Sequence, residues 1–325
     1  MNRRHLLSSG TAALLAGLSM PAWAQKYPGG PVSIVLPLQA GSASDVAVRH
    51  MAERLATRLG GGFVVDNVAA AAGLVGLEKI SRAKADGQTV AALNNSIMTI
   101  LPHLQAKNMK VDTRKDFVPV AGIANIPTFF AVPASSSVRN IQDLVKLAKS
   151  EPKRINYSSG GVGSPQHLAT EMFTAYTGSQ LTHVPYRGAS QAALAVATGE
   201  VQLMSMALSL AQPFLQDNRV RLIGYCGTER HAQFRDIPTL QEQGVRDYDY
   251  SSWVALFLHK DVPPDVLAVL RREAQAISED KDFQQQLIRS GLEPWPRTAA
   301  QLGPLVEGDF QRWKKIIQDA NIQGT

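Results

Sequence analysis

Cysteine, aromatic residues and long apolar runs are all scarce in this sequence. Only one of the 325 residues is a cysteine, Cys226, which excludes an internal disulfide and with it a disulfide-stapled miniprotein. Aromatic residues make up 6% and charged residues 18%, but the hydrophobic share of 45% excludes an intrinsically disordered chain. The one apolar stretch that stands out is residues 11–19, so a polytopic membrane protein is excluded as well. At about 150 residues per domain, the length predicts two domains.

Motifs for catalysis and for nucleic-acid binding are also lacking. Basic residues occur at most in pairs such as Arg271-Arg272, so no stripe for nucleic acid is present. No Gly-x-Ser-x-Gly turn for a nucleophile occurs, and the seven histidines show no His-x-x-His spacing for a metal. No phosphate-binding loop with Lys-Ser or Lys-Thr is found, and the glycines after Ser159 do not complete Gly-x-Gly-x-x-Gly. We therefore expect no metal, no cofactor and no nucleic-acid partner.

The N-terminus has the order of a secretory signal peptide. Arg3 and Arg4 precede the apolar segment 6–18, and Ala22-Trp23-Ala24 forms an Ala-x-Ala cleavage site. We expect residues 1–24 to be removed, so that the exported chain begins at Gln25. The arginine pair leaves twin-arginine export open, but His5-Leu6-Leu7 matches that pattern only loosely, so export by the Sec pathway is expected.

The rest of the chain alternates short β-rich runs with helical ones. Strands are expected at 32–36, 63–65, 89–93, 129–132, 155–157, 182–184 and 201–204, and helices at 44–59, 74–83, 141–149, 166–176 and 191–197. Three further helices are expected near 265–278, 281–289 and 301–319. This alternation predicts an α/β fold with helix-covered, mostly parallel sheets. Since the pattern occurs twice without a flexible linker, we expect two domains with a cleft between them and strands that cross directly.

Two strand-to-helix loops are the candidates for a ligand site. They are Gln39–Asp45, with Ser44 or Asp45 as the helix cap, and Ser158–Pro165, with Ser164 as the cap. Their glycines permit close backbone approach, and the N–H groups of a first helical turn have no partner within the helix. Such helix starts bind anions, so a carboxylate or a phosphate is expected between the loops.

At these residues the sequence resembles the Bug (TctC-like) family of periplasmic solute receptors. The matching segments follow one another along nearly the whole chain: Pro37–Asp45 with Arg49, Asp86-Gly87, Lys115–Val120, Asn156–Gly160, Gly163–Leu168, His183–Gly188, Asp236–Thr239 and Ser252-Trp253. The resemblance implies a two-domain periplasmic-binding-protein-like fold of type II (a Venus flytrap) without enzymatic activity. It also implies that one ligand carboxylate is held between the two loops and that the ligand passes to a tripartite tricarboxylate-type transporter in the membrane.

The resemblance also assigns residues and domains. The implied ligand-binding residues are Gln39, Gly41, Ser42 and Ser44 of one domain, Ser159, Gly160, Gly163 and Ser164 of the other, and in second place Asn95, Ser96, Tyr186 and Arg187. Residues 25–124 with about 221–325 are expected to form the first domain, and about 125–220 the second. The protein is expected to be a periplasmic monomer.

The sequence departs from the family pattern at several positions. These departures bear on the part of the ligand beyond its carboxylate. The sequence has Leu38-Gln39 where Phe-Pro is common and Ala69–Ala72 where a glycine-rich turn is common. It also has Ser205-Met206-Ala207 where an aspartate is common. Two other functions stay open at this point: a receptor that signals to a membrane sensor, and a secreted α/β hydrolase with a Ser–His pair.

Overall fold

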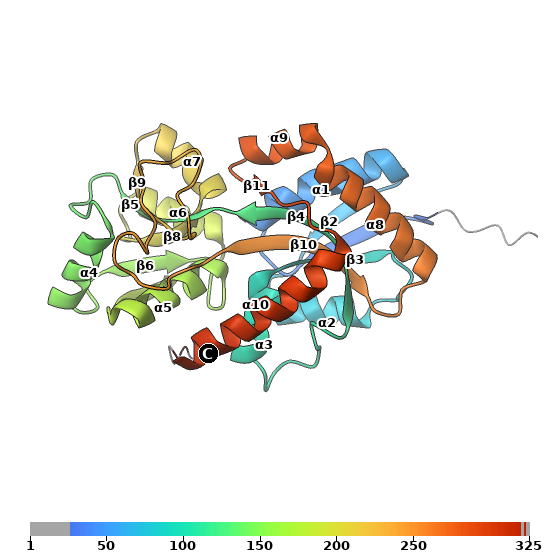
Figure 1. The fold of residues 1–325 in the computed structure, drawn as a ribbon, viewed down its shortest axis with the longest axis horizontal. Coiled ribbons are helices and arrows are strands. Elements are labelled where there is room, and N and C mark those ends of the chain that lie inside the picture. The colour runs from blue at the N-terminus through green and yellow to red at the C-terminus, as the bar shows by residue number, and fades with distance from the viewer. Residues whose placement is uncertain (1–26, 320–321, 323–325) are drawn as a thin grey trace, which may run out of the picture.

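A computed structural model describes residues 27–319 and residue 322, and the expected signal peptide lies outside these residues. The chain forms two lobes that lie side by side (Figure 1). Within the described residues, no helix is long and apolar enough to cross a membrane.

The first domain is built on a six-stranded mixed sheet. Its strands lie in the order β11 (Glu293–Pro294), β4 (Phe117–Ile126), β10 (Ser252–His259), β3 (Thr89–Asn94), β1 (Val32–Leu36) and β2 (Phe63–Asn67). Strand β1 is parallel to β2 and β3, as expected of the βαβαβ pattern, whereas β10 is antiparallel to β3 and β4. The carboxyl ends of β1 and β3 therefore share one edge of the sheet.

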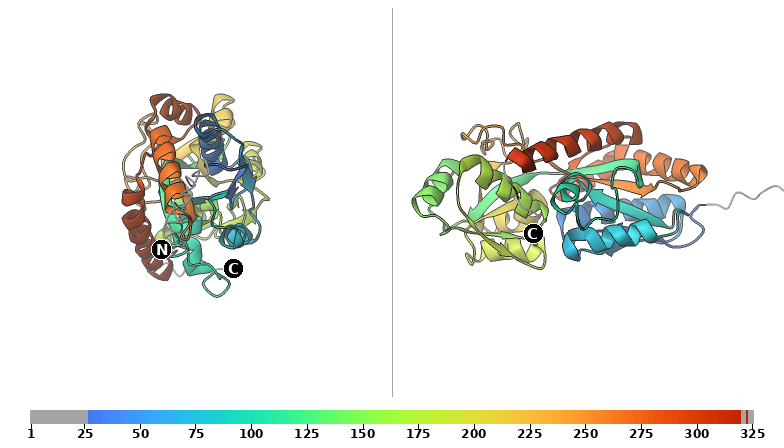
Figure 2. Two further views of the ribbon diagram at one scale, coloured as in Figure 1. Left: turned by 90° about the vertical axis from the view of Figure 1, so that its right-hand side faces the viewer. Right: turned by 90° about the horizontal axis from the view of Figure 1, so that it is seen from below.

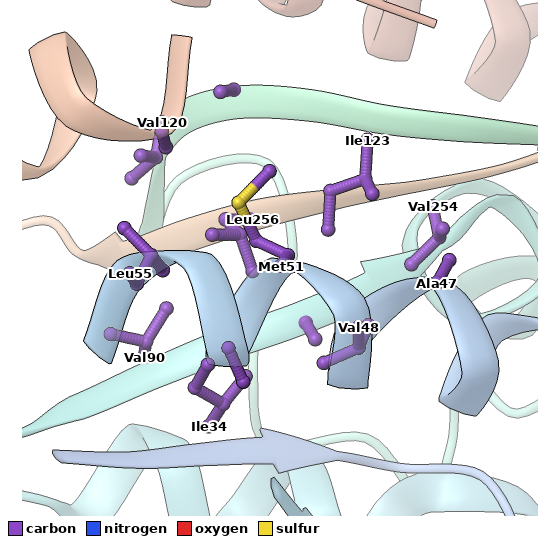
Figure 3. Packing of buried hydrophobic residues seen from close by; sticks show 14 of the residues in the cluster. Ile34, Ala47, Val48, Met51, Leu55, Val90, Val120, Ile123, Val254 and Leu256 are labelled. Atoms are coloured by element: carbon purple, nitrogen blue, oxygen red, sulfur yellow. The ribbon is translucent and has the colours of Figure 1, made fainter. Parts of the chain in front are cut away.

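Helices cover both faces of this sheet. They are α1 (Ala43–Leu59), α2 (Leu74–Arg82), α3 (Leu101–Leu104), α8 (Pro264–Glu279), α9 (Lys281–Arg289) and α10 (Ala299–Asp319), with a 3₁₀ turn at Ala71–Gly73 and a π-helical turn at Ser96–Ile100. The buried face of α1 packs on the sheet in the core of Figure 3, where Ala47, Val48, Met51 and Leu55 meet strand residues Ile34, Val90 and Leu256. Gly60 ends α1 with φ +74°, a backbone conformation that glycine adopts without penalty.

The second domain contains a smaller sheet. Strand β5 (Thr128–Pro133) pairs antiparallel with β8 (Met204–Ala207) and β9 (Val220–Tyr225). Strands β6 (Asn156–Ser159) and β7 (Thr182–Pro185) are parallel, and a bridge from Tyr157 to Leu203 joins them to this sheet. The surrounding helices are α4 (Ile141–Ser150), α5 (Pro165–Thr177), α6 (Ala189–Ala197) and α7 (Leu208–Gln216). The strand expected at 201–204 is displaced toward the C-terminus, because β8 pairs with β5 only from Met204 onward.

Two strands carry the chain between the domains. β4 runs on into β5 with only Pro127 between them, close to the crossing expected near residue 125. The chain returns with β10, later than the crossing expected near residue 221. The reason is that β9 extends the second sheet, and Leu240, Tyr248 and Tyr250 are buried in the core of that domain.

Helix α10 lies across both domains, as Figure 2 shows. Its first half places Leu302 and Val306 in the core of the first domain, and its second half places Trp313 and Ile316 in the core of the second. The two domains are therefore joined by β4, β10 and α10.

Candidate functional site

The first loop leads from β1 into α1 and presents the start of that helix to the second domain. Ser42 is the N-cap of α1, because its hydroxyl accepts from the Asp45 N–H at 3.2 Å. The cap therefore lies two residues before Ser44, the earlier of the two caps expected from the sequence. Asp45 is buried, and its carboxylate accepts from the Gly41 N–H, from Arg49 and from Asn67. The N–H groups of Ala43 and Ser44 accordingly remain the first-turn donors of α1.

The second loop leads from β6 into α5 in the same way. Ser164 caps the helix by accepting from the His167 N–H, and Pro165 occupies its first position. The Gly163 N–H donates to His167 Nδ1 at 3.3 Å, so that nitrogen carries no proton and this N–H is already used within the loop. The Gln166 N–H, in the first turn of α5, remains as a donor.

A third helix start, which the sequence reasoning did not identify, joins these two. α6 begins at Ala189, and Ala189 lies against Gly160, since a Cβ placed on Gly160 would be 3.0 Å from the Ala189 nitrogen. Ala189 has no polar side chain, so its backbone N–H is the only donor that it offers to a ligand. For this reason, no residue type in the sequence marked this helix start as part of the site.

These three helix starts surround a small inner cavity of about 40 Å³. Its walls are Leu38, Gln39, Ser42, Ala43, Ser44, Ile126, Thr128, Gly160, Ser164, Pro165, Gln166, Ala189, Ser205, Ala207 and Ser252. None of these described residues is charged, so the positive potential comes from the helix N-termini, each equivalent to about half an elementary charge. The Ser205 hydroxyl, which is fully buried beside the Cys226 thiol, a weak hydrogen-bond partner, adds a polar group to the wall. A buried group of this kind is expected to meet a ligand or a water.

A larger outer cavity of about 480 Å³ adjoins the inner one. The two share Leu38, Gln39, Gly160 and Ser164, and the outer one extends over the start of α2, the π-helical turn and α3. Its remaining walls are Pro37, Ala69, Ala71, Ala72, Leu74, Ile97, Leu101, Leu104, Gln105, Asn108, Gly161, Val162, Gly163 and His167. A ligand can thus place an anionic group in the inner cavity and its body in the outer one.

Two histidines, His167 and His183, contact the second loop. The ring of His167 lies 4.4 Å from that of His183, which stacks on Tyr157 at 4.8 Å. Burial lowers the pKa of His167 to about 4. Burial lowers the pKa of His183 to about 4. The neighbouring His167 also lowers this pKa, whereas Glu171 raises it. Both rings are therefore neutral near pH 7, and neither supplies a positive charge to a ligand.

Half of the expected site residues lie in the cavity walls: Gln39, Ser42, Ser44, Gly160, Gly163 and Ser164. The other six lie outside both walls, and all but Arg187 have hydrogen bonds within the described structure. The Gly41 carbonyl accepts from Ser190, Asn95 bonds Ser251 and Ser252 where β10 enters the first domain, and Ser96 donates to Asn94. Tyr186 donates to Glu200, and Arg187 is exposed.

Ser159, the remaining one of these six, organises the second loop. Its hydroxyl is 2.6 Å from His183 Nε2, accepts from the Gly161 N–H and donates to the Gly161 carbonyl. Its side chain is fully buried and lines neither cavity, so this Ser–His pair has no access to a substrate. Among the residues that the structure describes, no group of three His, Cys, Asp or Glu side chains is placed to hold a metal ion.

The fold is shared with known proteins. Residues 47–322 match the family described as "Tripartite tricarboxylate transporter family receptor" (TctC). The "UPF0065 protein in tcbD-tcbE intergenic region" of Pseudomonas sp. (strain P51) is 28% identical, over 99% of this chain and 96% of its own length. The structure "R. palustris Rpa4515 with adipate" has a TM-score of 0.86 and 28% identity, covering 91% of this chain and 99% of its own. The periplasmic binding protein BugD has a TM-score of 0.85 and 25% identity, with the same shares covered.

Proposed function

The chain belongs to the tripartite tricarboxylate transporter receptor family, whose members are periplasmic solute-binding proteins without enzymatic activity, and we propose that it captures one small carboxylate between its two domains. The family and the α/β binding-protein fold that the sequence motifs implied are thereby confirmed. We further propose that the captured acid is delivered to the membrane subunits of a tripartite transporter.

The observation that carries the proposal is the meeting of three helix N-termini at one uncharged cavity. At about 40 Å³ the inner cavity is less than a tenth the size of the outer one, about 480 Å³, so it suits a small group rather than the body of a ligand. Backbone donors at a helix start favour an anion over a neutral group. A carboxylate is favoured over a phosphate because the described walls lack the arginine or lysine that phosphate sites commonly use. The relative from R. palustris, in complex with adipate, supports the same ligand class.

A thermal-shift screen tests this function. Mono-, di- and tricarboxylates, sugars and amino acids are each added in excess over the protein. An acid present at 100 times its dissociation constant is expected to stabilise the folded state by about 2.7 kcal/mol. A screen in which only sugars or uncharged compounds raise the melting temperature would overturn the proposal.

We also propose that the mature protein begins at Gln25 in the periplasm. The support is the order of Arg3-Arg4, the apolar segment 6–18 and Ala22-Trp23-Ala24. Intact-mass analysis of exported protein is expected to give a chain that lacks residues 1–24. Exported protein that retains these residues would contradict the proposal.

A further inference from the structure

We infer that the natural ligand carries one carboxylate only, and that the rest of it is an uncharged, mainly hydrocarbon chain or ring. This inference rests on the proposed function and narrows it from small carboxylates in general to apolar monocarboxylates. It follows from the outer cavity, where the body of the ligand has to lie.

The outer cavity is mainly apolar. Ile97 and Leu101 are buried side chains of its inner wall, and Leu74 and Leu104 are half-buried. Pro37, Leu38, Ala71, Ala72 and Val162 add further apolar surface. At about 480 Å³, the space falls within the range of about 300–1,000 Å³ that is usual for small-molecule sites. It accommodates a ring or a medium-length chain, and burial of such a group is favourable in proportion to its apolar area.

No Lys, Arg, Asp or Glu is among the described residues that line either cavity. His167 lies in the outer wall, but its Nδ1 accepts from the Gly163 N–H, and burial lowers its pKa to about 4, so it is uncharged near pH 7. A second carboxylate in this cavity would lose hydration without gaining a charged partner. The start of α2 does not replace one, because the Leu74 and Val75 N–H groups already donate to the Ala71 and Ala70 carbonyls. An amino group would equally lack a carboxylate to pair with.

The inner cavity cannot take the second charge either. It is less than a tenth the size of the outer cavity, and the starts of α1, α5 and α6 that would hold the first carboxylate all line this one small space. A diacid therefore has to place its second carboxylate among mainly apolar side chains and uncharged amides, or reach the exposed mouth near Asn108.

Two matched pairs of acids test the inference by calorimetric titration at pH 7.5: hexanoate with adipate, and benzoate with terephthalate. In adipate a carboxylate replaces the terminal methyl group of hexanoate, and in terephthalate a carboxylate replaces the para hydrogen of benzoate. We expect the monoacid to bind at least about tenfold more tightly in each pair, a difference of about 1.4 kcal/mol. A diacid that binds as tightly as its monoacid, or a screen whose hits all carry a second charge, would overturn the inference and leave the proposed function standing. If no carboxylate of any kind binds, the proposed function fails, and the inference fails with it.

A variant at the mouth gives a second readout. Asn108 is exposed and lines the outer cavity, so Asn108→Arg supplies a cation without disturbing the core. We expect Asn108→Arg to bind adipate several-fold more tightly than wild type, whereas Asn108→Met, of similar length and uncharged, leaves adipate binding weak. Equal adipate binding by both variants and wild type would contradict the assignment of this cavity to the ligand's body.

Discussion

The hydroxyl of Ser190 donates to the carbonyl oxygen of Gly41 at 3.0 Å, from the first turn of α6 to the loop before α1. This hydrogen bond joins the two domains directly across the cleft, beside the inner cavity. Close backbone approaches accompany it. A Cβ placed on Gly163 would lie 3.1 Å from the Ala72 Cβ, and one placed on Gly188 would lie 3.4 Å from the Gln39 Cβ. The structure thus has the two domains in contact around the site, and hinge closure of this kind is common in periplasmic binding proteins.

Removal of the Ser190 hydroxyl is expected to weaken ligand binding. Ser190→Ala loses one neutral hydrogen bond, worth about 0.5–1.5 kcal/mol, that forms only when the domains meet. We expect the dissociation constant to rise about two- to tenfold, mainly through faster release, as stopped-flow measurements would show. The matched control is Ser150→Ala in α4, where the lost bond to the Leu147 carbonyl stays within one helix. Equal release rates for Ser190→Ala and wild type would mean that this contact does not hold the cleft closed.

Removal of one backbone donor tests the helix starts themselves. Ala43→Pro deletes the N–H at the first position of α1, where proline is well tolerated, and the extended backbone of Ser42 (ψ 160°) suits a residue before proline. A hydrogen bond to a charged group contributes about 1.5–3 kcal/mol, so we expect affinity for the carboxylate to fall about 10- to 150-fold.

The control for this variant is Lys281→Pro at the first position of α9. This position has the same geometry after an N-cap residue but does not line either cavity. Calorimetric titration of both variants is expected to show loss of binding only for Ala43→Pro. Comparable affinities for the two variants would exclude the Ala43 N–H as a donor to the ligand.

The glycine at the tip of the second loop is expected to be required for closure. Gly163 has φ +76°, and an added methyl group would meet Ala72 of the opposite domain. Gly163→Ala therefore costs roughly 1–2 kcal/mol in backbone strain and also obstructs the contact between the domains.

Gly199→Ala separates these two effects. Gly199 has φ +79° with nothing within 4 Å of an added Cβ, so it incurs the strain without the obstruction. We expect similar decreases in the urea midpoint for both variants, but loss of ligand affinity only for Gly163→Ala. If both variants bind like wild type, the tip of the second loop does not contact the opposite domain in the bound state.

The buried histidines predict a loss of stability in mild acid. The pKa of His167 is about 4 in the folded chain and about 6.5 when the residue is exposed, so the unfolded chain takes up the proton first as the pH falls. The free energy of unfolding is therefore expected to decrease between about pH 6.5 and pH 4. In His167→Gln, which retains an acceptor for the Gly163 N–H, we expect a smaller decrease in the urea midpoint between pH 7 and pH 5. An unchanged pH dependence would show that His167 is not the group responsible.

Local sequence signals were sufficient where a strand leads into a capped helix. The strand expected at 32–36 coincides with β1, because its β-branched residues favour a strand locally. The expected helix end at Leu59 coincides with the end of α1, because Gly60-Gly61 stops the helix there. The helix at 281–289 coincides with α9 for the same kind of reason, with Asp280 as its cap. These signals also located both loops of the site, since Ser and Gly before a helix are visible in the sequence itself.

The rest of the site depends on tertiary structure. Thr128, Ser205 and Ser252 reach the inner cavity because β8 pairs with β5, and β10 pairs with β4, next to the point where the chain crosses between domains. On β8, Ser205 lines the cavity while its neighbour Met206 is buried in the core, an alternation that depends on where the strand pairs. Local patterns carry no information about which distant strands pair. The domain crossing near residue 221 was misplaced for the same reason, because β9 joins the second sheet through non-local pairing.

The most direct test of the central claim compares a carboxylic acid with its own primary amide in wild-type protein. The amide has nearly the same shape but no charge, so the comparison isolates what the three helix starts contribute at the inner cavity. With the best acid of the screen, calorimetric titration at pH 7.5 is expected to give at least about 100-fold weaker binding for the amide, or about 2.8 kcal/mol. Equal affinity for the acid and the amide would contradict the assignment of the inner cavity as a carboxylate site.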